Sequence, residues 1–202
     1  MSLVRVAVMG GSFNPVHKGH IAVAREVLKQ GLADEVWLLV SPQNPLKAHT
    51  ALLDEKVRYR LTCQALSDEA HIEASDFEFA LPRPSYTWLT LDKLSRRFPQ
   101  MRFSLLIGAD NWCLFDRWAH TDYILRNFPL IIYPREGYPV RVGSLPPSVH
   151  LLTGVPAFPF SSTDIRRAVA DGRPVADMVP SAIVVEVERL YAPSTRQAAL
   201  DW

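Results

Sequence analysis

The chain has 202 residues, of which 48% are hydrophobic and 21% are charged, and its formal net charge is +1. This length fits one ordinary domain, and the composition is that of a globular protein, not of a disordered one. The nearly neutral charge excludes a global field that would attract nucleic acid or an anionic membrane. Any anion site must therefore be local.

The cysteines and the start of the chain indicate the compartment. Cys63 and Cys113 show no metal-ligand spacing, which favours a reducing compartment over structural zinc. The first residues form a strand-like run, so no signal peptide is expected, and no apolar stretch is long enough to span a membrane. We therefore expect a soluble, cytoplasmic protein that binds neither nucleic acid nor membrane. The oligomeric state stays open, a homo-oligomer included.

Apolar strand-like runs alternate with helical patterns along most of the chain. Strands are expected at 3–9, 35–40, 71–74, 102–107, 130–133 and 150–152. Helices are expected at 17–30, 54–67, 87–98, 121–127, 162–170 and 180–191. Residues 77–84 and 134–147 are expected to form loops. In the second helix the pattern turns Val57 and Leu61 inward and leaves Arg58 and Arg60 to solvent.

This alternation predicts an α/β protein: a Rossmann-like parallel sheet with helices on both faces. A single domain is expected over residues 1–192, followed by a C-terminal tail over 193–202. Ligands of such sheets bind beyond the carboxyl ends of the strands. The site is therefore expected in the loops that follow Met9, Val40, Ile107 and Tyr133.

The loop between the first strand and the first helix combines glycines with two histidines. It reads Gly10-Gly11-Ser12-Phe13-Asn14-Pro15-Val16-His17-Lys18-Gly19-His20. Glycines let backbone N–H groups approach a phosphate closely, and the helix N-terminus beyond them adds partial positive charge. His17 and His20 lie on one face of the first helical turn. Taken alone, the pair could also be two surface histidines, or a zinc pair that lacks a third ligand.

The whole string resembles the GxFxPxHxGH motif of the nucleotidylyltransferase superfamily. The resemblance implies that both histidines hydrogen-bond a nucleoside triphosphate and stabilise the charge that moves onto the leaving pyrophosphate. It implies Mg²⁺ as the cofactor, with ATP as co-substrate. The residues implied in ATP binding here are Gly10, Gly11, Ser12, Phe13 and Gly19, and Asn14 is implied in binding the second substrate.

A second phosphate site is predicted at Phe160-Ser161-Ser162-Thr163-Asp164-Ile165-Arg166. Hydroxyl groups at a helix N-terminus cap the helix and donate to an anion, and an arginine one turn later can fork onto phosphate oxygens. Alone, the string could be an ordinary cap with a solvated arginine. It resembles the superfamily element I-S-S-T-x-I-R, with Phe160 in place of Ile. This implies that Ser161, Ser162 and Thr163 bind ATP and that Arg166 stabilises its phosphates.

The middle of the chain resembles bacterial nicotinate-nucleotide adenylyltransferases, and the resemblance runs from about Val4 to Tyr191. The matching elements are Ser85-Tyr86-Thr87, Gly108-Ala109-Asp110, Trp118 and Arg135-Glu136-Gly137-Tyr138. From the residues alone, Trp118 could be a core aromatic and Asp110 a turn former.

The resemblance assigns roles to these residues. Tyr86 and Thr87 are implied in binding the nicotinate carboxylate, and Trp118 in stacking on the pyridine ring. Gly108 and Asp110 are implied in the nucleotide site, with Asp110 near a ribose. Arg135 is implied to approach the phosphate of the mononucleotide.

The loop after the second strand departs from the family pattern. Where family members often have Pro-Pro-His-Lys, this chain has Asn44-Pro45-Leu46-Lys47. Lys47 is kept and is expected to contact phosphate, but the family histidine is absent, and His49 is an unproven substitute.

Together these motifs imply transfer of the adenylyl group of ATP to nicotinate mononucleotide, giving nicotinate adenine dinucleotide and pyrophosphate, a step of NAD biosynthesis. The expected catalytic groups are His17, His20, Lys47 and Arg166. No general base is required, because the attacking phosphate is already anionic. Two alternatives stay open: a nucleotide sensor without chemistry, and an adenylyltransferase for another acceptor such as nicotinamide mononucleotide.

Overall fold

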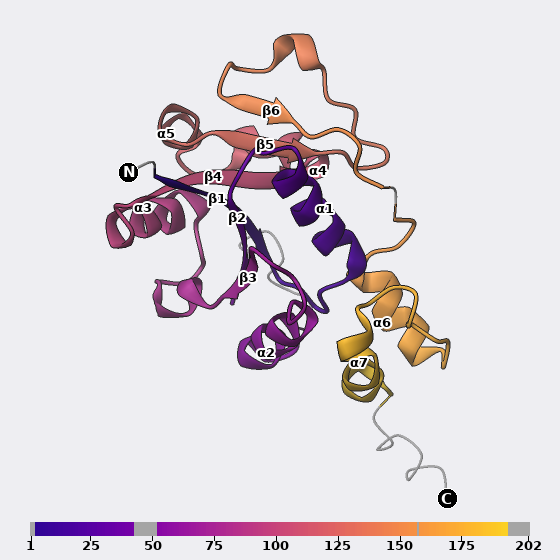
Figure 1. Cartoon of the computed structure of the whole chain (residues 1–202). Coiled ribbons are helices and arrows are strands. Elements are labelled where there is room, and N and C mark those ends of the chain that lie inside the picture. Colours follow the sequence, from indigo (N-terminus) through magenta and orange to yellow (C-terminus); the bar gives the residue numbers. More distant parts are fainter. Residues whose placement is uncertain (1–2, 43–51, 157, 194–202) are drawn as a thin grey trace, which may run out of the picture.

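The structure, a computed structural model, describes residues 3–42, 52–156 and 158–193. At its centre is a six-stranded sheet in the order β3-β2-β1-β4-β5-β6, in which all neighbouring strands are parallel. The strands are β1 (Val4–Gly11), β2 (Glu35–Val40), β3 (Ile72–Ser75), β4 (Met101–Gly108), β5 (Leu130–Tyr133) and β6 (Val149–Leu151). The predicted Rossmann-like sheet is therefore confirmed (Figure 1).

Helices connect the strands. They are α1 (Lys18–Lys29), α2 (Glu55–Ala65), α3 (Thr87–Arg97), α4 (Ala109–Trp112), α5 (Thr121–Asn127), α6 (Ser162–Ala170) and α7 (Val184–Tyr191). Short 3₁₀ turns occur at Phe77–Ala80, Phe115–Arg117, Val142–Ser144 and Ser181–Ile183. The sequence pattern missed α4 and the first three turns, because elements of three or four residues are too short to show a helical period. The turn at Ser181–Ile183 lies inside the helix predicted at 180–191. The predicted tail lies outside the described residues from position 194 onward.

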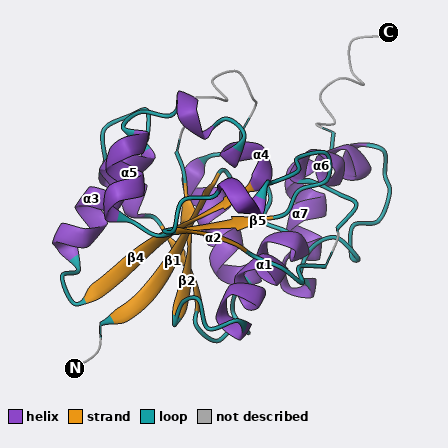
Figure 2. Cartoon of the chain, turned by 90° about the horizontal axis from the view of Figure 1, so that it is seen from above, coloured by secondary structure: helices purple, strands orange, loops and turns teal. Residues whose placement is uncertain are grey.

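The side chains of β1 show why both faces of the sheet are covered. Ala7 and Met9 point into a hydrophobic cluster with residues of α1, α2, α6 and α7, whereas Val6 and Val8 point into a second cluster with residues of α3 and α5. All four residues are at most 3% exposed. Burial on both faces explains the nearly continuous apolar runs in the strands. Figure 2 shows the helices on the two sides of the sheet.

The strand order reverses at β1, and this reversal positions the site. β2 and β3 follow on one side of β1, while β4 lies on the other side, with Val8 paired to Leu105. Connections that leave the carboxyl ends of β1 and β4 in opposite directions open a crevice between them. Gly10 and Gly11 end β1 and Gly108 ends β4, so the predicted glycine-rich segments meet at this crevice.

Arg58 differs from its prediction. The helical pattern of α2 placed it at the solvent-exposed face, but the residue is 1% exposed. Its guanidinium donates to the backbone carbonyls of Leu53 and Ser41, at 2.9 and 3.0 Å. The prediction was wrong because helical periodicity indicates only which face of a helix packs against the hydrophobic core. It does not show that a long polar side chain can be buried by hydrogen bonds to neighbouring loops.

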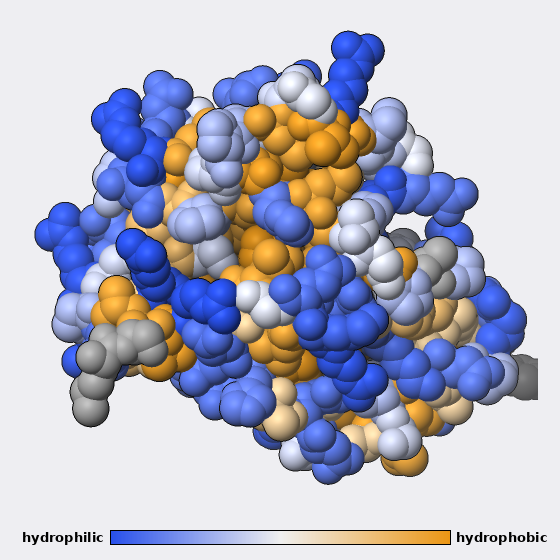
Figure 3. All heavy atoms as spheres, turned by 45° about the horizontal axis from the view of Figure 1, so that its top comes forward, coloured by the Kyte–Doolittle hydropathy of each residue, from blue (hydrophilic) through white to orange (hydrophobic). Residues whose placement is uncertain are grey.

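No helix in the described part of the chain is long and apolar enough to cross a membrane. Figure 3 shows one face of the molecule, where hydrophobic side chains gather in the centre and hydrophilic ones surround them. In the connection between β5 and β6, Tyr138 and Val142 are 46% and 63% exposed. Exposed apolar side chains are a normal part of protein surfaces, so they indicate no partner by themselves.

Candidate functional site

A cavity of about 680 Å³ lies at the carboxyl ends of β1, β4 and β5, a volume in the range of small-molecule sites. Most of the predicted site residues line it: Gly10, Gly11, Ser12, Phe13, His17, His20, Tyr86, Thr87, Gly108, Asp110, Trp118, Arg135, Ser161, Ser162, Thr163 and Arg166. Segments from both halves of the chain therefore meet around one space. Asn14 and Gly19 do not line the cavity, and Lys47 lies outside the described residues.

The loop after β1 is held in shape by close packing. Phe13 is 2% exposed and adopts a left-handed backbone conformation with φ of 42°, which is uncommon for a bulky residue. A Cβ added at Gly11 would lie 2.9 Å from the Phe13 ring, so only glycine leaves that ring its place. The other side of the ring meets His20 edge-on, with centroids 5.0 Å apart. Packing within the chain therefore supports this loop conformation.

The two histidines at the start of α1 lie against each other, with ring centroids 3.7 Å apart. The backbone N–H of His17 donates to Nδ1 of His20 at 3.2 Å. A neutral His20 therefore carries its proton on Nε2, where it can donate to an anion. His17 is 4% exposed, and its Nδ1 has no hydrogen-bond partner among the described residues.

His17 is an uncharged ring at neutral pH. Burial, and second the positive charge of Arg135, lower the pKa of His17 to about 3. The ring can therefore hydrogen-bond to a phosphate as a neutral group. A bound triphosphate would favour its protonated form, since a nearby negative charge raises the pKa of a histidine.

The second predicted phosphate motif begins α6 with a capping box. Ser161 donates from its N–H and from Oγ to Oδ2 of Asp164, at 2.8 and 2.6 Å. The hydroxyl of Ser162 donates to the carbonyl of Pro15 at 2.9 Å, and Nη1 of Arg166 donates to the carbonyl of Asn14 at 2.8 Å. The two motifs, 147 residues apart in the Ser162–Pro15 contact, are therefore joined directly.

Asn14 supports the loop from behind. The residue is 1% exposed, and its Oδ1 accepts from the N–H of Leu53 at 3.3 Å and from the hydroxyl of Tyr191 at 2.7 Å. These bonds connect the loop after β1 to the start of α2 and to the end of α7. The role of Asn14 in substrate binding stays a prediction.

Another part of the cavity wall comes from the N-terminus of α3 and from Trp118. Tyr86 is the N-cap residue of α3 and Thr87 its first residue, and the first N–H groups of a helix have no partner within the helix. Trp118 packs near Phe115, with centroids 5.5 Å apart. Its buried Nε1 has no hydrogen-bond partner in the described part of the chain. An aromatic face thus lies in the same cavity as backbone donors.

Asp110 and Arg135 meet at the ends of β4 and β5. Nε of Arg135 lies 3.8 Å from Oδ1 of Asp110, and Nη2 donates to the hydroxyl of Tyr133 at 3.3 Å. A Cβ added at Gly108 would lie 2.3 Å from Oδ1 of Asp110. It would also lie 3.1 Å from the ring of Tyr133, so a larger residue at position 108 would displace side chains that line the cavity.

Several lining residues were not predicted, among them Glu78, Thr90 and Arg117, and Ser85 was part of a matching element without a role of its own. The hydroxyl of Thr90 donates to Oε1 of Glu78 at 2.9 Å. Oε2 of Glu78 and Oγ of Ser85 are buried without a partner among the described residues. The sequence contained two signals for the missed residues: Glu78 lies between two phenylalanines, and Arg117 directly precedes Trp118.

Comparison with known proteins agrees with this geometry. The Cytidylyltransferase-like family model matches residues 8–168. A probable nicotinate-nucleotide adenylyltransferase of Bacteroides thetaiotaomicron is 45% identical over 172 residues, 85% of this chain and 85% of the relative. One of Bacteroides fragilis is 40% identical, over 91% of this chain and 90% of the relative.

Solved structures share the fold. The Plasmodium falciparum nicotinic acid mononucleotide adenylyltransferase complexed with NaAD superposes with a TM-score of 0.77 at 17% identity, over 93% of this chain and 96% of that one. A putative nicotinate-nucleotide adenylyltransferase of Vibrio parahaemolyticus gives a TM-score of 0.65 at 21% identity, over 93% and 95% of the two chains. By its sequence relatives and its family-model match, the chain belongs to the nicotinate-nucleotide adenylyltransferase family, within the cytidylyltransferase-like proteins.

Proposed function

We propose that this protein transfers the adenylyl group of ATP to the 5′-phosphate of nicotinate mononucleotide and releases pyrophosphate. The observation that supports this most is the shared cavity. The loop after β1 and the N-terminus of α6, joined by the bond from Ser162 to Pro15, line it together with Tyr86 and Trp118. The same cavity therefore offers hydrogen-bond donors for the triphosphate of ATP and an aromatic surface for the pyridine ring of the second substrate.

The chemistry needs positioning more than proton transfer. An oxygen of the acceptor phosphate attacks the α-phosphorus of ATP, a new P–O bond forms, and the bond from the α-phosphorus to the bridging oxygen breaks. The electron pair leaves with pyrophosphate. The nucleophile is already anionic, so the site has to align the two substrates and to stabilise negative charge on the leaving group.

The charge-stabilising groups are drawn from the two phosphate motifs. We assign this role to His20 through its Nε2 proton, to His17 as a neutral ring, and to Arg166. Arg166 bonds to Asn14 and Thr163, at 2.8 and 3.1 Å, so the protein itself orients its guanidinium. Lys47 is proposed as a further phosphate contact from the family pattern alone.

The acceptor side suits a carboxylate. The first N–H groups of α3 and the positive end of its dipole favour an anion there. Trp118 offers a flat surface for the pyridine ring. We therefore propose that the acid, nicotinate mononucleotide, is preferred over the amide.

Mg²⁺ is proposed to enter with the triphosphate. Within the ranges that the structure describes, no group of three histidine, cysteine or acidic side chains could hold a metal ion by itself. Asp110 and Glu78 are the acidic residues that line the cavity. This donor set fits an ion held mainly by phosphate oxygens and water, as is usual for Mg²⁺ at nucleotide sites, where it neutralises phosphate charge. We further propose that the enzyme is cytoplasmic and that residues 1–192 fold as one domain.

The function is tested by pyrophosphate release from ATP and nicotinate mononucleotide, in the wild type and in His20→Ala. The wild type is expected to turn over. His20→Ala is expected to keep its circular dichroism spectrum and to lose about 10²–10³-fold in kcat, the usual cost of removing one donor to developing charge.

His150→Ala is the matched control, because His150 is an exposed histidine on β6 that does not line the cavity. It should turn over like the wild type. A wild type that binds ATP and releases no pyrophosphate would support the alternative of a nucleotide sensor. A near-normal rate in His20→Ala would remove the role assigned to this histidine.

A further inference from the structure

Arg58 is among the largest fully buried side chains of the described residues, at 1% exposure. It lies in the first turns of α2 and does not line the cavity. A buried arginine is costly unless its donors are satisfied. The hydrogen-bond partners of its guanidinium therefore indicate which parts of the fold Arg58 stabilises.

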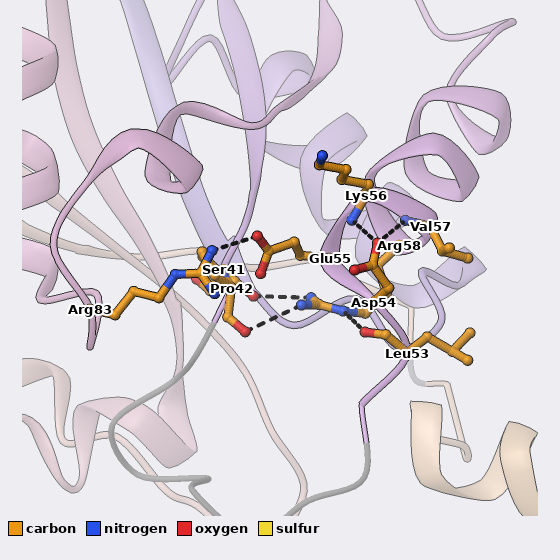
Figure 4. A network of polar contacts seen from close by, with 9 residues as sticks. All are labelled: Ser41, Pro42, Leu53, Asp54, Glu55, Lys56, Val57, Arg58 and Arg83. Carbon is orange, nitrogen blue, oxygen red and sulfur yellow. Dashed lines mark hydrogen bonds and ion pairs between the residues drawn. The ribbon is translucent and has the colours of Figure 1, made fainter.

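Among the residues that the structure describes, the guanidinium of Arg58 donates to backbone carbonyls and to no side chain. Nε donates to Leu53 at 2.9 Å, Nη1 to Ser41 at 3.0 Å and Nη2 to Pro42 at 3.4 Å. Nη1 also donates to the carbonyl of Ser12. Figure 4 shows the side chain extended between Leu53 on one side and Ser41 and Pro42 on the other. One side chain thus joins the loop after β1, the end of β2 and the residues before α2.

Within the described ranges, no carboxylate accepts a hydrogen bond from Arg58. The nearby Glu55 forms its ion pair with Arg83 instead. Burial lowers the pKa of Arg58, although a guanidinium stays charged at neutral pH. Fixed carbonyl dipoles replace the water around this buried charge. The carbonyls belong to three separate segments, so their bonds to one guanidinium hold these segments in one arrangement.

A second set of bonds links the same segments. The N–H of Ser41 donates to the carbonyl of Gly11 at 2.8 Å. The N–H of Leu53 donates to Oδ1 of Asn14 at 3.3 Å. Gly11 and Ser12 line the cavity. The wall that faces the nucleotide is therefore fastened from behind to the chain on both sides of residues 43–51.

We infer that Arg58 is a positioning residue, which fixes the loop after β1 against the end of β2 and the start of α2. It acts on the nucleotide through Ser12 and makes no contact with substrate itself. This inference rests on the proposed function, in that the ligand of the loop is the triphosphate of ATP. Misplacing such a loop by about 1 Å can cost about 10²-fold in rate.

The test compares Arg58→Met and Arg58→Lys with Leu61→Ala. Leu61 is a 2% exposed core residue of the same helix that does not line the cavity, and its truncation destabilises α2 without touching the guanidinium contacts. Steady-state kinetics are measured at a temperature where circular dichroism shows each variant folded. Arg58→Met should lose about 10²-fold in kcat/KM for ATP, with a smaller change in KM for nicotinate mononucleotide, because Tyr86 and Trp118 lie on other segments.

Arg58→Lys keeps the charge but cannot span four carbonyls, so it should recover only part of the loss. It also replaces Arg58→Met in the comparison if the methionine variant does not fold. Leu61→Ala should lose less than about threefold in kcat/KM, since cavity formation in a core lowers stability and not alignment. A loss in the Arg58 variants no larger than in Leu61→Ala would overturn the inference.

Amide hydrogen exchange without nucleotide gives a readout that is independent of turnover. The amides of Ser41 and Leu53 should exchange at least tenfold faster in the Arg58 variants than in Leu61→Ala, while those in β4 stay matched. Equal exchange at these two amides would contradict the positioning role. A wild type without turnover would overturn the proposed function, and the exchange comparison would still decide the role of Arg58.

Discussion

His17 is a buried ring whose protonation is coupled to folding. In the unfolded chain it takes up a proton below its ordinary pKa of 6.5, whereas the folded ring stays neutral down to about 3. Between these values the unfolded state binds more protons, so the free energy of unfolding rises with pH by ~1.4 kcal/mol per pH unit from this group. Lowering the pH from about 7.5 to about 5 should therefore cost ~2 kcal/mol.

The measurement is urea unfolding at both pH values, in the wild type and in His17→Asn. The variant should lose about 2 kcal/mol less of its stability on acidification than the wild type. His150→Asn, which alters an exposed histidine, should behave like the wild type. Equal pH dependence in all three proteins would show that His17 is not held neutral.

Gly10 and Gly11 are adjacent but have different reasons to be glycine. A Cβ added at Gly10 would meet no atom of the described protein within 4 Å, whereas one at Gly11 would lie 2.9 Å from the ring of Phe13. Gly10 also lines the cavity. Gly10→Ala should therefore leave the unfolding midpoint nearly unchanged but raise the KM for ATP about tenfold, as expected of an overpacked contact.

Gly11→Ala is the control for this experiment, and it should lower the unfolding midpoint in thermal melts. The account of the loop would be contradicted if Gly10→Ala destabilised the protein as much as Gly11→Ala, or if Gly10→Ala bound ATP normally.

The sequence could predict which residues meet at the cavity, because the two phosphate motifs are long strings with a defined spacing. It could not predict what each side chain does there. Arg58 was assigned to solvent, yet it is 1% exposed and donates to backbone carbonyls of other segments. Asn14, which the sequence predicts to bind substrate, is also 1% exposed and accepts hydrogen bonds from Leu53 and Tyr191. Apart from Leu53, which Arg58 contacts five residues away, these partners lie 16 or more residues away along the chain, and local patterns contain no information on such contacts.

The start of α6 depends on a carboxylate inside the helix. Hydrogen bonds from Ser161 lower the pKa of Asp164, which keeps the cap formed at neutral pH. Asp164→Ala should lower the free energy of unfolding by about 1 kcal/mol, the usual worth of a helix cap. It should also raise the KM for ATP about threefold to tenfold, because the hydroxyl of Ser161 loses its partner.

Asp171→Ala is the matched control, since Asp171 is an exposed acid at the C-terminal end of the same helix. An acid there opposes the helix dipole, so its removal should not destabilise the protein. The cap would have no role in nucleotide binding if both variants had the same KM for ATP.

Elements with several turns or with a β-branched apolar run could be predicted from the sequence. β2, β5 and α6 begin and end where the pattern placed them. The segment after β4 was different, because α4 and the turn at 115–117 are defined by packing of Phe115 against Trp112 and Trp118. These contacts place Trp118 in the cavity wall. The sequence predicted Trp118 as a site residue, but it did not predict the aromatic contacts that hold it there.

At the scale of the whole molecule, the site arises from the strand order. Parallel pairing of β1 with β4 brings Gly11 and Gly108 to one crevice, although β2, β3 and three helices separate them in the chain. Alternation of strands and helices predicted the class of fold and the edge of the sheet that binds ligand. Which strands become neighbours depends on long-range packing, and the chain pattern alone does not fix it.

The central claim is that one cavity joins ATP to nicotinate mononucleotide. The most direct test supplies ATP labelled at the α-phosphate, in parallel reactions with nicotinate mononucleotide, nicotinamide mononucleotide and pantetheine phosphate, and separates the products by chromatography. The label should appear in a dinucleotide formed from nicotinate mononucleotide, faster than with the amide, and pantetheine phosphate should give no product. Label that stays in ATP, or that moves preferentially to another acceptor, would contradict the account.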